Sequence, residues 1–293
     1  MIPGEIIEFL ISWFQHGISP STRIISTVAL GGGSINQAFR VETSSGNYFL
    51  KYNLAKRYPG MFAFEARGLT ILENAACIQV PGVLHYTETG NYSFLLLGFI
   101  KSQVPSANFW QLFGQQLALL HQKSSPDFGL DHDNYIGSLK QSNNNHLRWT
   151  EFLIGERLQP QVKLAFDESL LNIRDLQRLE LLYKKLPEIL PVEPPSLIHG
   201  DLWSGNYMVG SDGNPCIIDP AVYYGHREMD IAMSKLFGGF SMEFYRSYNE
   251  EYPMEKGWED RVELNQLYPL LVHLNLFGGG YSRQVRQVLM AYQ

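Results

Sequence analysis

The chain has 293 residues, of which 45% are hydrophobic and 18% charged, so it has a globular composition and is not an intrinsically disordered chain. Its net charge of −6 argues against a nucleic-acid-binding protein, and its two cysteines are too few for a disulfide framework. The apolar runs are far shorter than a membrane span, and the N-terminal segment has acids where a signal peptide would have basic residues. We therefore expect a cytoplasmic protein without a nucleic-acid or membrane partner.

The first hundred residues have the pattern of a small sheet with helices. Apolar residues at helical spacing predict helices over 1–17 and 59–76. Runs rich in β-branched and aromatic residues predict strands over 23–30, 37–43, 47–52, 83–87 and 92–100, with a hairpin turn at Ser44–Gly46. The sequence therefore predicts five strands and one inserted helix before residue 100.

The remainder of the chain is predominantly helical in pattern. The helices that we predict cover 108–123, 147–165, 168–185, 227–237, 242–251, 258–277 and 281–291. A polar stretch over 127–145 is predicted as a loop, and prolines at 187, 191, 194 and 195 are expected to break the chain. Short buried strands are predicted at 196–198, 207–209 and 216–218.

The most informative stretch contains His199, Asp201, Asn206 and Asp219, at the spacing of a phosphotransferase catalytic loop and the metal-binding segment that follows it. Phosphoryl transfer to a hydroxyl needs a carboxylate beside the attacking oxygen and oxygen ligands for Mg²⁺ on the ATP phosphates. Asp201 fits the first role, and Asn206 and Asp219 fit the second. A His-x-Asp triplet alone often arises by chance, but the full spacing is far more restrictive and favours a kinase over a structural explanation.

A glycine-rich segment, Gly31–Asn36, lies between two predicted strands. Glycines let backbone N–H groups approach phosphate oxygens, although a plain hairpin turn explains the segment equally well when it is taken alone. The segment precedes Lys51, which lies at the end of an apolar strand. This order favours phosphate binding by the nucleotide-binding candidates Gly32, Gly33, Ser34 and Asn36. Lys51 is then the lysine that contacts the ATP phosphates. Glu65 on the next helix can pair with Lys51 or can be a solvated helix carboxylate, and we favour the pairing.

The chain resembles the fructosamine kinase family, within the protein-kinase-like and aminoglycoside phosphotransferase superfamily. The matching stretches extend over nearly the whole chain: 32–36, 64–66, 128–137, 199–206, 219–230 and 268–279. The motifs in His199–Asn206 and Asp219–Glu228 are more specific to this family than the general superfamily pattern. One departure is Gly98, where we expect an acidic residue, and it concerns only the adenine side of the site.

This resemblance implies an α+β, bilobal, protein-kinase-like fold. The N-terminal lobe, residues 1–100, would hold an antiparallel five-stranded sheet with one main helix and bind ATP. A larger, mostly helical lobe, residues 101–293, would carry catalysis and the substrate. The implied activity is ATP-dependent phosphorylation of the sugar 3-hydroxyl of ketosamines, a deglycation repair reaction. Ketosamines are fructosamine, ribulosamine or erythrulosamine adducts of small amines or protein lysines.

The remaining candidates support the site or contact the substrate. We expect His199 to anchor the loop and Asp230 to hydrogen-bond the loop backbone. Trp203 can belong to the core or give a sugar a flat apolar face, and we favour stacking. Tyr224 and His226, from the family signature, are further candidate substrate contacts.

Two other functions stay open. A phosphotransferase for another small hydroxyl compound, such as an aminoglycoside or choline, would share Asp201, Asn206 and Asp219. A nucleotide-binding pseudokinase is less favoured, because it requires the loss of a catalytic group. The chain keeps Lys51, Asp201, Asn206 and Asp219.

Overall fold

The computed structural model describes residues 1–31 and 35–292, so the predicted phosphate-binding residues Gly32, Gly33 and Ser34 lie outside the described residues. The chain packs as two units. The first consists of Met1–Ser106 and Met208–Ile218, and the second of Ala107–Tyr207 and Asp219–Gln293. The sequence predicted a nucleotide-binding lobe over 1–100 and a catalytic and substrate lobe over 101–293. This division of function stays a prediction.

The first unit contains the predicted antiparallel five-stranded sheet, in the order β1-β2-β3-β5-β4. Its elements are α1 (Gly4–Gly17), β1 (Ile24–Leu30), β2 (Gln37–Thr43), β3 (Gly46–Leu54), α2 (Met61–Ala75), β4 (Val83–Thr89) and β5 (Tyr92–Gly98). Residues 208–218 add most of a hairpin formed by β9 (Tyr207–Val209) and β10 (Pro215–Ile217). The five predicted strands and the main helix are therefore confirmed.

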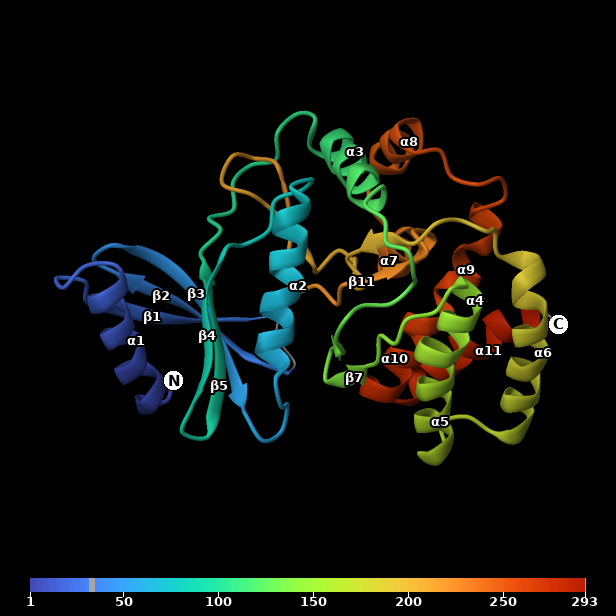
Figure 1. The fold of residues 1–293 in the computed structure, drawn as a ribbon, viewed down its shortest axis with the longest axis horizontal. Coiled ribbons are helices and arrows are strands. Elements are labelled where there is room, and N and C mark those ends of the chain that lie inside the picture. Colours follow the sequence, from blue (N-terminus) through green and yellow to red (C-terminus); the bar gives the residue numbers. More distant parts are fainter. Residues whose placement is uncertain (32–34, 293) are drawn as a thin grey trace. The chain divides into compact units, whose positions relative to one another are not determined.

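Alternation along β3 sends neighbouring side chains to opposite faces of this sheet. Leu50 and Tyr52 pack in the core formed with the apolar side of α1, including Leu10. Lys51 points the other way and pairs with Glu65 of α2. Figure 1 shows α1 and α2 on opposite faces of the sheet. The periodicity of one strand thus directs Leu50 and Tyr52 toward α1 and Lys51 toward α2.

The second unit is mainly helical. Its helices are α3 (Phe109–His121), α4 (Trp149–Phe152), η1 (Leu153–Leu158, a π-helix), α5 (Gln159–Asp167), α6 (Ile173–Ile189), α7 (Glu228–Leu236), α8 (Met242–Glu251), η2 (Glu259–Arg261), α9 (Val262–Asn265), α10 (Leu267–Phe277), η3 (Gly279–Tyr281) and α11 (Ser282–Ala291). Two short antiparallel pairs join β6 (Asn134–Ile136) to β7 (Leu139–Gln141) and β8 (Ser196–Ile198) to β11 (Tyr223–Gly225).

One apolar core joins α4–α6, α10 and α11 to the short strands β8 and β11. Figure 1 shows α3 lying beside α8. Their close packing depends on Gly114, because a Cβ atom there would lie 2.3 Å from the carbonyl oxygen of Phe244. The predicted larger, mostly helical C-terminal part is confirmed.

Three sequence predictions were wrong in detail, and one strand was missed. The stretch 127–145 is not only loop, since it contains the β6–β7 hairpin, and β11 was not predicted. Helix α6 begins at Ile173, where Asn172 and Asp175 form a capping box, and not at residue 168. Pro187 lies inside this helix and does not break it, because the apolar side continues through Leu186 to Leu190 in the core.

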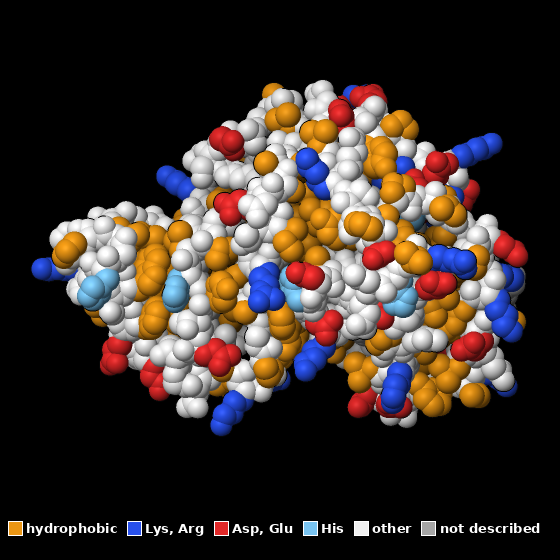
Figure 2. Space-filling view, in the orientation of Figure 1, with side chains coloured by type: hydrophobic (Ala, Val, Ile, Leu, Met, Phe, Trp, Pro, Cys, Tyr) orange, Lys and Arg blue, Asp and Glu red, His pale blue; other side chains and the backbone are white. Residues whose placement is uncertain are grey.

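Within residues 1–31 and 35–292, no helix is both long and apolar enough to cross a membrane. Figure 2 shows acidic, basic and apolar side chains interspersed on the face that it draws.

Candidate active site

The predicted catalytic loop follows β8 directly. β8 pairs with β11 in antiparallel register, with Ile198 opposite Tyr223, and the backbone N–H of Ala221 donates to the carbonyl of His199 at 2.9 Å. Gly200 has φ +82°, and a Cβ atom there would lie 2.1 Å from the carbonyl oxygen of Ala221. Glycine is therefore required at this position for the loop to pass the segment that follows Asp219.

Asp201 and Asn206 are joined within the loop. The amide nitrogen of Asn206 donates to the backbone carbonyl of Asp201 at 2.8 Å and to its Oδ2 at 2.9 Å. A turn closes between them, because the N–H of Asn206 donates to the carbonyl of Trp203 at 2.9 Å. The Trp203 ring lies over Gly205, where a Cβ atom would approach it to 2.4 Å. The spacing of Asp201 and Asn206 in the sequence thus becomes a fixed pair of side chains.

Asp230 holds the start of this loop from α7. Its Oδ2 accepts a hydrogen bond from the backbone N–H of His199 at 2.7 Å, and its Oδ1 accepts one from Gly200 at 2.9 Å. The expected hydrogen bonds to the loop backbone are therefore present. A third contact runs to His121 at 3.2 Å, and the other ring nitrogen of His121 bonds the hydroxyl of Tyr248 at 2.8 Å. The side chains of this chain of contacts are buried.

The carboxyl groups of Asp201, which is partly buried, and Asp230, which is fully buried, have opposite pKa shifts. Burial raises the pKa of Asp201 well above its usual range, against the hydrogen bond from Asn206, and the negative charges of Asp219 and Asp230 raise it further. Burial also acts against ionisation of Asp230, but its bonds to His121 and the loop backbone hold its pKa below the usual range. Asp230 is thus a fixed anion, and Asp201 is the more basic carboxylate, as a proton acceptor should be.

The side chains of Asn206 and Asp219 suit a hard cation. The side-chain nitrogen of Asn206 donates both of its hydrogen bonds to Asp201, so the side-chain oxygen of Asn206 points away from Asp201. Asp219 is exposed and has φ +54°, an uncommon backbone conformation that often marks functional sites. No group of three or more His, Cys, Asp and Glu side chains is placed to hold a metal in residues 1–31 and 35–292. Two oxygen ligands fit Mg²⁺, which commonly binds few protein groups and completes its shell with phosphates and water.

A small cavity opens beside Asp201 within the second unit. Tyr268, Pro269, Val272 and His273 of α10 line it together with Ile136 and residues of α7. The stretch 268–279 matches the family pattern, but the sequence predicted no role in the site for its side chains. The signal available in the sequence was only that this stretch belongs to the family pattern.

A buried polar network behind this cavity was also missed. The hydroxyl of Tyr268 donates to Gln141 at 2.6 Å, and Gln141 donates to Asn134 at 2.8 Å and to the carbonyl of Ala221 at 3.3 Å. Asn134 donates to the carbonyl of Val222 at 2.8 Å. The β6–β7 hairpin therefore fixes the backbone just after Asp219, which gives a physical role to the quoted stretch 128–137.

The three candidate substrate residues do not lie in equivalent surroundings. Trp203 is partly exposed and contacts Phe237, with ring centroids 5.6 Å apart. Tyr224 is partly buried in β11, opposite Leu197. His226 is fully buried, 5.9 Å from the ring of Trp149 and 3.6 Å from a Glu193 oxygen. In this structure His226 is thus a packing residue, and its predicted contact with the acceptor is untested.

The nucleotide-binding candidates of the first unit form a separate group. Lys51 Nζ lies 2.6 Å from Glu65 Oε1, and both side chains are largely buried. The pairing that we favoured over a solvated Glu65 is thus present. Asn36 accepts a hydrogen bond from Asn53 at 2.9 Å. The phosphate-binding roles of these residues stay predictions.

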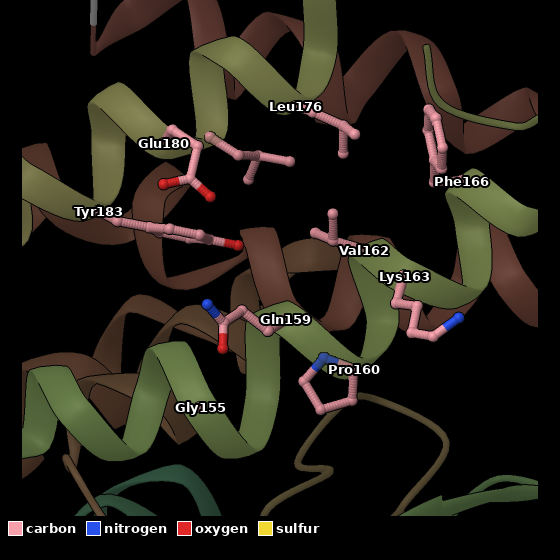
Figure 3. Close-up of a pocket in the computed structure, with 10 residues that line it drawn as sticks. Gly155, Gln159, Pro160, Val162, Lys163, Phe166, Leu176, Glu180 and Tyr183 are labelled. Atoms are coloured by element: carbon pink, nitrogen blue, oxygen red, sulfur yellow. The ribbon is translucent and has the colours of Figure 1, made fainter. Parts of the chain in front are cut away.

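A second cavity of the second unit, of about 470 Å³, lies between α5 and α6. Figure 3 shows Val162, Phe166 and Leu176 around it, with Tyr183 and Gln159 at one end. Its walls are mainly apolar and contain none of the predicted catalytic residues. We assign no chemistry to it.

The fold defines the class of protein: it is the kinase-like fold, and Asp201, Asn206 and Asp219 are the residue types that phosphoryl transfer to a hydroxyl requires. Solved structures of aminoglycoside phosphotransferase APH(4)-Ia share this fold, with a TM-score of 0.63 and 16% identity for a complex with AMP-PNP and hygromycin B. At that identity the likeness concerns the fold alone.

Comparison with known sequences gives the family. Residues 8–292 match the fructosamine kinase family. The chain is 42% identical to a probable ketoamine kinase of Enterococcus faecium, over 88% of this chain and 92% of that protein. It is 37% identical to the chloroplastic protein-ribulosamine 3-kinase of Oryza sativa, over 93% of this chain and 80% of that protein.

A solved structure agrees. The crystal structure of a candidate fructosamine-3-kinase from Haemophilus somnus superposes with a TM-score of 0.87 at 28% identity, covering 98% of this chain and 96% of that one. The chain belongs to the fructosamine kinase family and is an ATP-dependent phosphotransferase.

Proposed function

We propose that this enzyme transfers the γ-phosphoryl group of ATP to the sugar 3-hydroxyl of ketosamines, the adducts that sugars form with small amines or with protein lysines. The observation that carries the proposal is the hydrogen-bonded Asp201–Asn206 pair beside a cavity of the second unit, in a chain of this family. The rice relative, named a protein-ribulosamine 3-kinase, supports the 3-hydroxyl as the acceptor.

Asp201 is the proposed base. It accepts the proton of the 3-hydroxyl as that oxygen bonds to the γ-phosphorus and the bond from phosphorus to the ADP oxygen breaks. The products are ADP, the ketosamine 3-phosphate and a proton, which Asp201 releases to solvent. The Asn206 amide fixes the rotamer of Asp201, and Asp230 fixes the loop backbone ahead of it. The chemistry thus depends mainly on positioning and charge, as in other phosphoryl transfers.

Asn206 and Asp219 are the proposed Mg²⁺ ligands. A bound Mg²⁺ neutralises charge that develops on the transferred phosphoryl group. Lys51, oriented by Glu65, is the proposed partner of the ATP phosphates, together with the backbone of Gly32, Gly33 and Ser34 and with Asn36. Trp203 and Tyr224 are the proposed sugar contacts.

A panel of acceptors tests this function. ATP consumption should be measured with fructosamine, ribulosamine and erythrulosamine adducts, an aminoglycoside and choline, and the product located by ³¹P NMR. We expect turnover with ketosamines and a 3-phosphate product. Turnover only with the aminoglycoside or choline would favour the alternative of another small hydroxyl substrate. A cytoplasmic location stays a prediction, and the rice relative is described as chloroplastic.

A further inference from the structure

A row of aromatic rings begins at Trp203 and continues away from the catalytic loop. Its members are Trp203, Phe237, His273, Phe277 and Tyr281, and we call this set the aromatic row. Ring centroids are 5.6 Å apart for Trp203–Phe237 and 4.8 Å for Phe237–His273. From His273 the centroid distances are 5.5 Å to Phe277 and 5.3 Å to Tyr281. Because His273 also lines the cavity beside Asp201, the row is continuous with the candidate active site.

The rings of this row remain accessible to a ligand. Phe277 is 55% exposed, and the other four side chains are partly exposed. Burying an aromatic side chain is favourable, so a contiguous set of rings left open at a site indicates a surface that a ligand covers. Folding alone does not account for the exposure of Phe277.

Three consecutive glycines separate Phe277 from Tyr281. Gly278 has φ +88°, which favours glycine. Gly279 and Gly280 lack a positive φ, and a Cβ atom at either would meet nothing within 4 Å. Neither backbone conformation nor packing requires these two glycines, and their effect is to keep the surface beside the two rings free of side chains.

The charge of the row suits an amine. The Nδ1–H of His273 donates to the carbonyl of Pro269 at 2.8 Å, and burial lowers the pKa of His273, so its ring is neutral near pH 7. A neutral ring does not repel the ammonium group of a ketosamine. Aromatic faces attract such a cation electrostatically. In a ketosamine the amine is attached to carbon 1, so its substituent extends away from the 3-hydroxyl at Asp201.

We propose that the aromatic row binds the amine-side substituent of the acceptor and favours ketosamines of apolar amines, such as arylalkyl amines, over those of small amines. This inference rests on the proposed function. It assigns Phe277 and Tyr281 as specificity-determining residues outside the reacting centre.

The test is steady-state kinetics with one sugar and three amines: the ribulosamines of methylamine, butylamine and benzylamine. For the parent enzyme we expect KM to fall from the methylamine to the benzylamine adduct. Phe277→Ala and Tyr281→Ala should raise KM for the benzylamine adduct about 5- to 10-fold, with kcat and the KM of the methylamine adduct changed less than about twofold. Phe277→Leu should restore part of the loss. Leu181→Ala, which removes another exposed apolar side chain of the second unit, is the matched control.

The glycines give a readout that a structural role would not produce. Gly279→Ala and Gly280→Ala should keep or raise the Tm and still raise KM for the benzylamine adduct. Equal KM ratios between the adducts in all variants, or the same change in Leu181→Ala, would overturn the inference while leaving the proposed function intact. Absence of turnover with every ketosamine would overturn the proposed function and this inference with it.

Discussion

Asp230 fixes the backbone of His199: its Oδ2 accepts the N–H of that residue at 2.7 Å, two residues ahead of the proposed base. Asp230→Ala would leave this N–H and that of Gly200 buried without their acceptor. Because a lost charged acceptor is costly, we expect a fall of about 2–4 kcal/mol in the free energy of unfolding and a lower kcat. Urea denaturation followed by tryptophan fluorescence measures the first. Asp260→Asn, at an exposed position, is the control, and equal stabilities of the two variants would contradict the prediction.

Asp201→Asn should separate chemistry from binding. The asparagine keeps an oxygen that can accept the Asn206 amide hydrogen bond, but it cannot take up the proton of the acceptor hydroxyl. We expect kcat to fall by about 10²–10⁴-fold while the Kd of ATP stays roughly unchanged. Coupled measurement of ADP release gives the first value and equilibrium binding gives the second. A variant with near-parental kcat would remove Asp201 from the role of base.

Asp219 is best tested with asparagine, because its φ of +54° would strain an alanine and asparagine tolerates this conformation. Asp219→Asn retains one oxygen ligand but loses the negative charge. We expect the Mg²⁺ concentration for half-maximal rate to rise about tenfold or more. Rates should be titrated with Mg²⁺ at saturating ATP. An unchanged Mg²⁺ dependence would count against this residue as a metal ligand.

Lys51→Met should weaken the nucleotide end of the site. The substitution removes the charge that lies 2.6 Å from Glu65. We expect kcat/KM for ATP to fall by about 10²–10³-fold, the size typical of losing one preorganised electrostatic contact. Glu65→Gln, which only loosens the orientation of Lys51, should have a smaller effect in the same direction. A larger effect for Glu65→Gln than for Lys51→Met would reverse the assignment.

His226 should make stability depend on pH. Burial lowers the pKa of His226; the carboxylates of Glu228 and Glu193 oppose this shift, and the guanidinium groups of Arg227 and Arg261 add to it. The unfolded chain takes up a proton below pH about 6.5 while the folded state keeps the neutral ring. The free energy of unfolding should therefore fall as pH drops below about 6.5, until the lower folded pKa is passed.

His226→Asn isolates this contribution. In the parent protein, His226 Nδ1 accepts a hydrogen bond from the backbone N–H of Glu228 at 3.3 Å, and the amide oxygen of the introduced asparagine can accept the same bond. Between pH 8 and pH 5.5 the variant should lose less stability than the parent in urea denaturation. Equal losses in the two proteins would show that His226 does not titrate differently on unfolding.

The sequence alone determined the features that depend on local pattern. The strands of the first unit and helix α8, predicted at 242–251 and observed at Met242–Glu251, follow from period-2 and 3.6-residue patterns between clear turn signals. The spacing from Asp201 to Asn206 predicted that the two residues share one catalytic loop, and only the structure shows the hydrogen bond at 2.9 Å between their side chains. The Lys51–Glu65 pair was predicted from one strand and the next helix, and it is present.

Only the tertiary structure decided the features that depend on partners distant in the chain. β11 exists because it pairs with β8, and the β6–β7 hairpin is held through Gln141 and Tyr268, which are separated by 127 positions. The aromatic row joins residues from 203 to 281. The local sequence pattern around His273 does not predict that this residue contacts Phe237 and lines the cavity beside Asp201. Local propensity determines which segments can form helices or strands. Long-range hydrogen bonds and core packing decide which side chains meet, because these interactions stabilise the fold only once distant segments have come together.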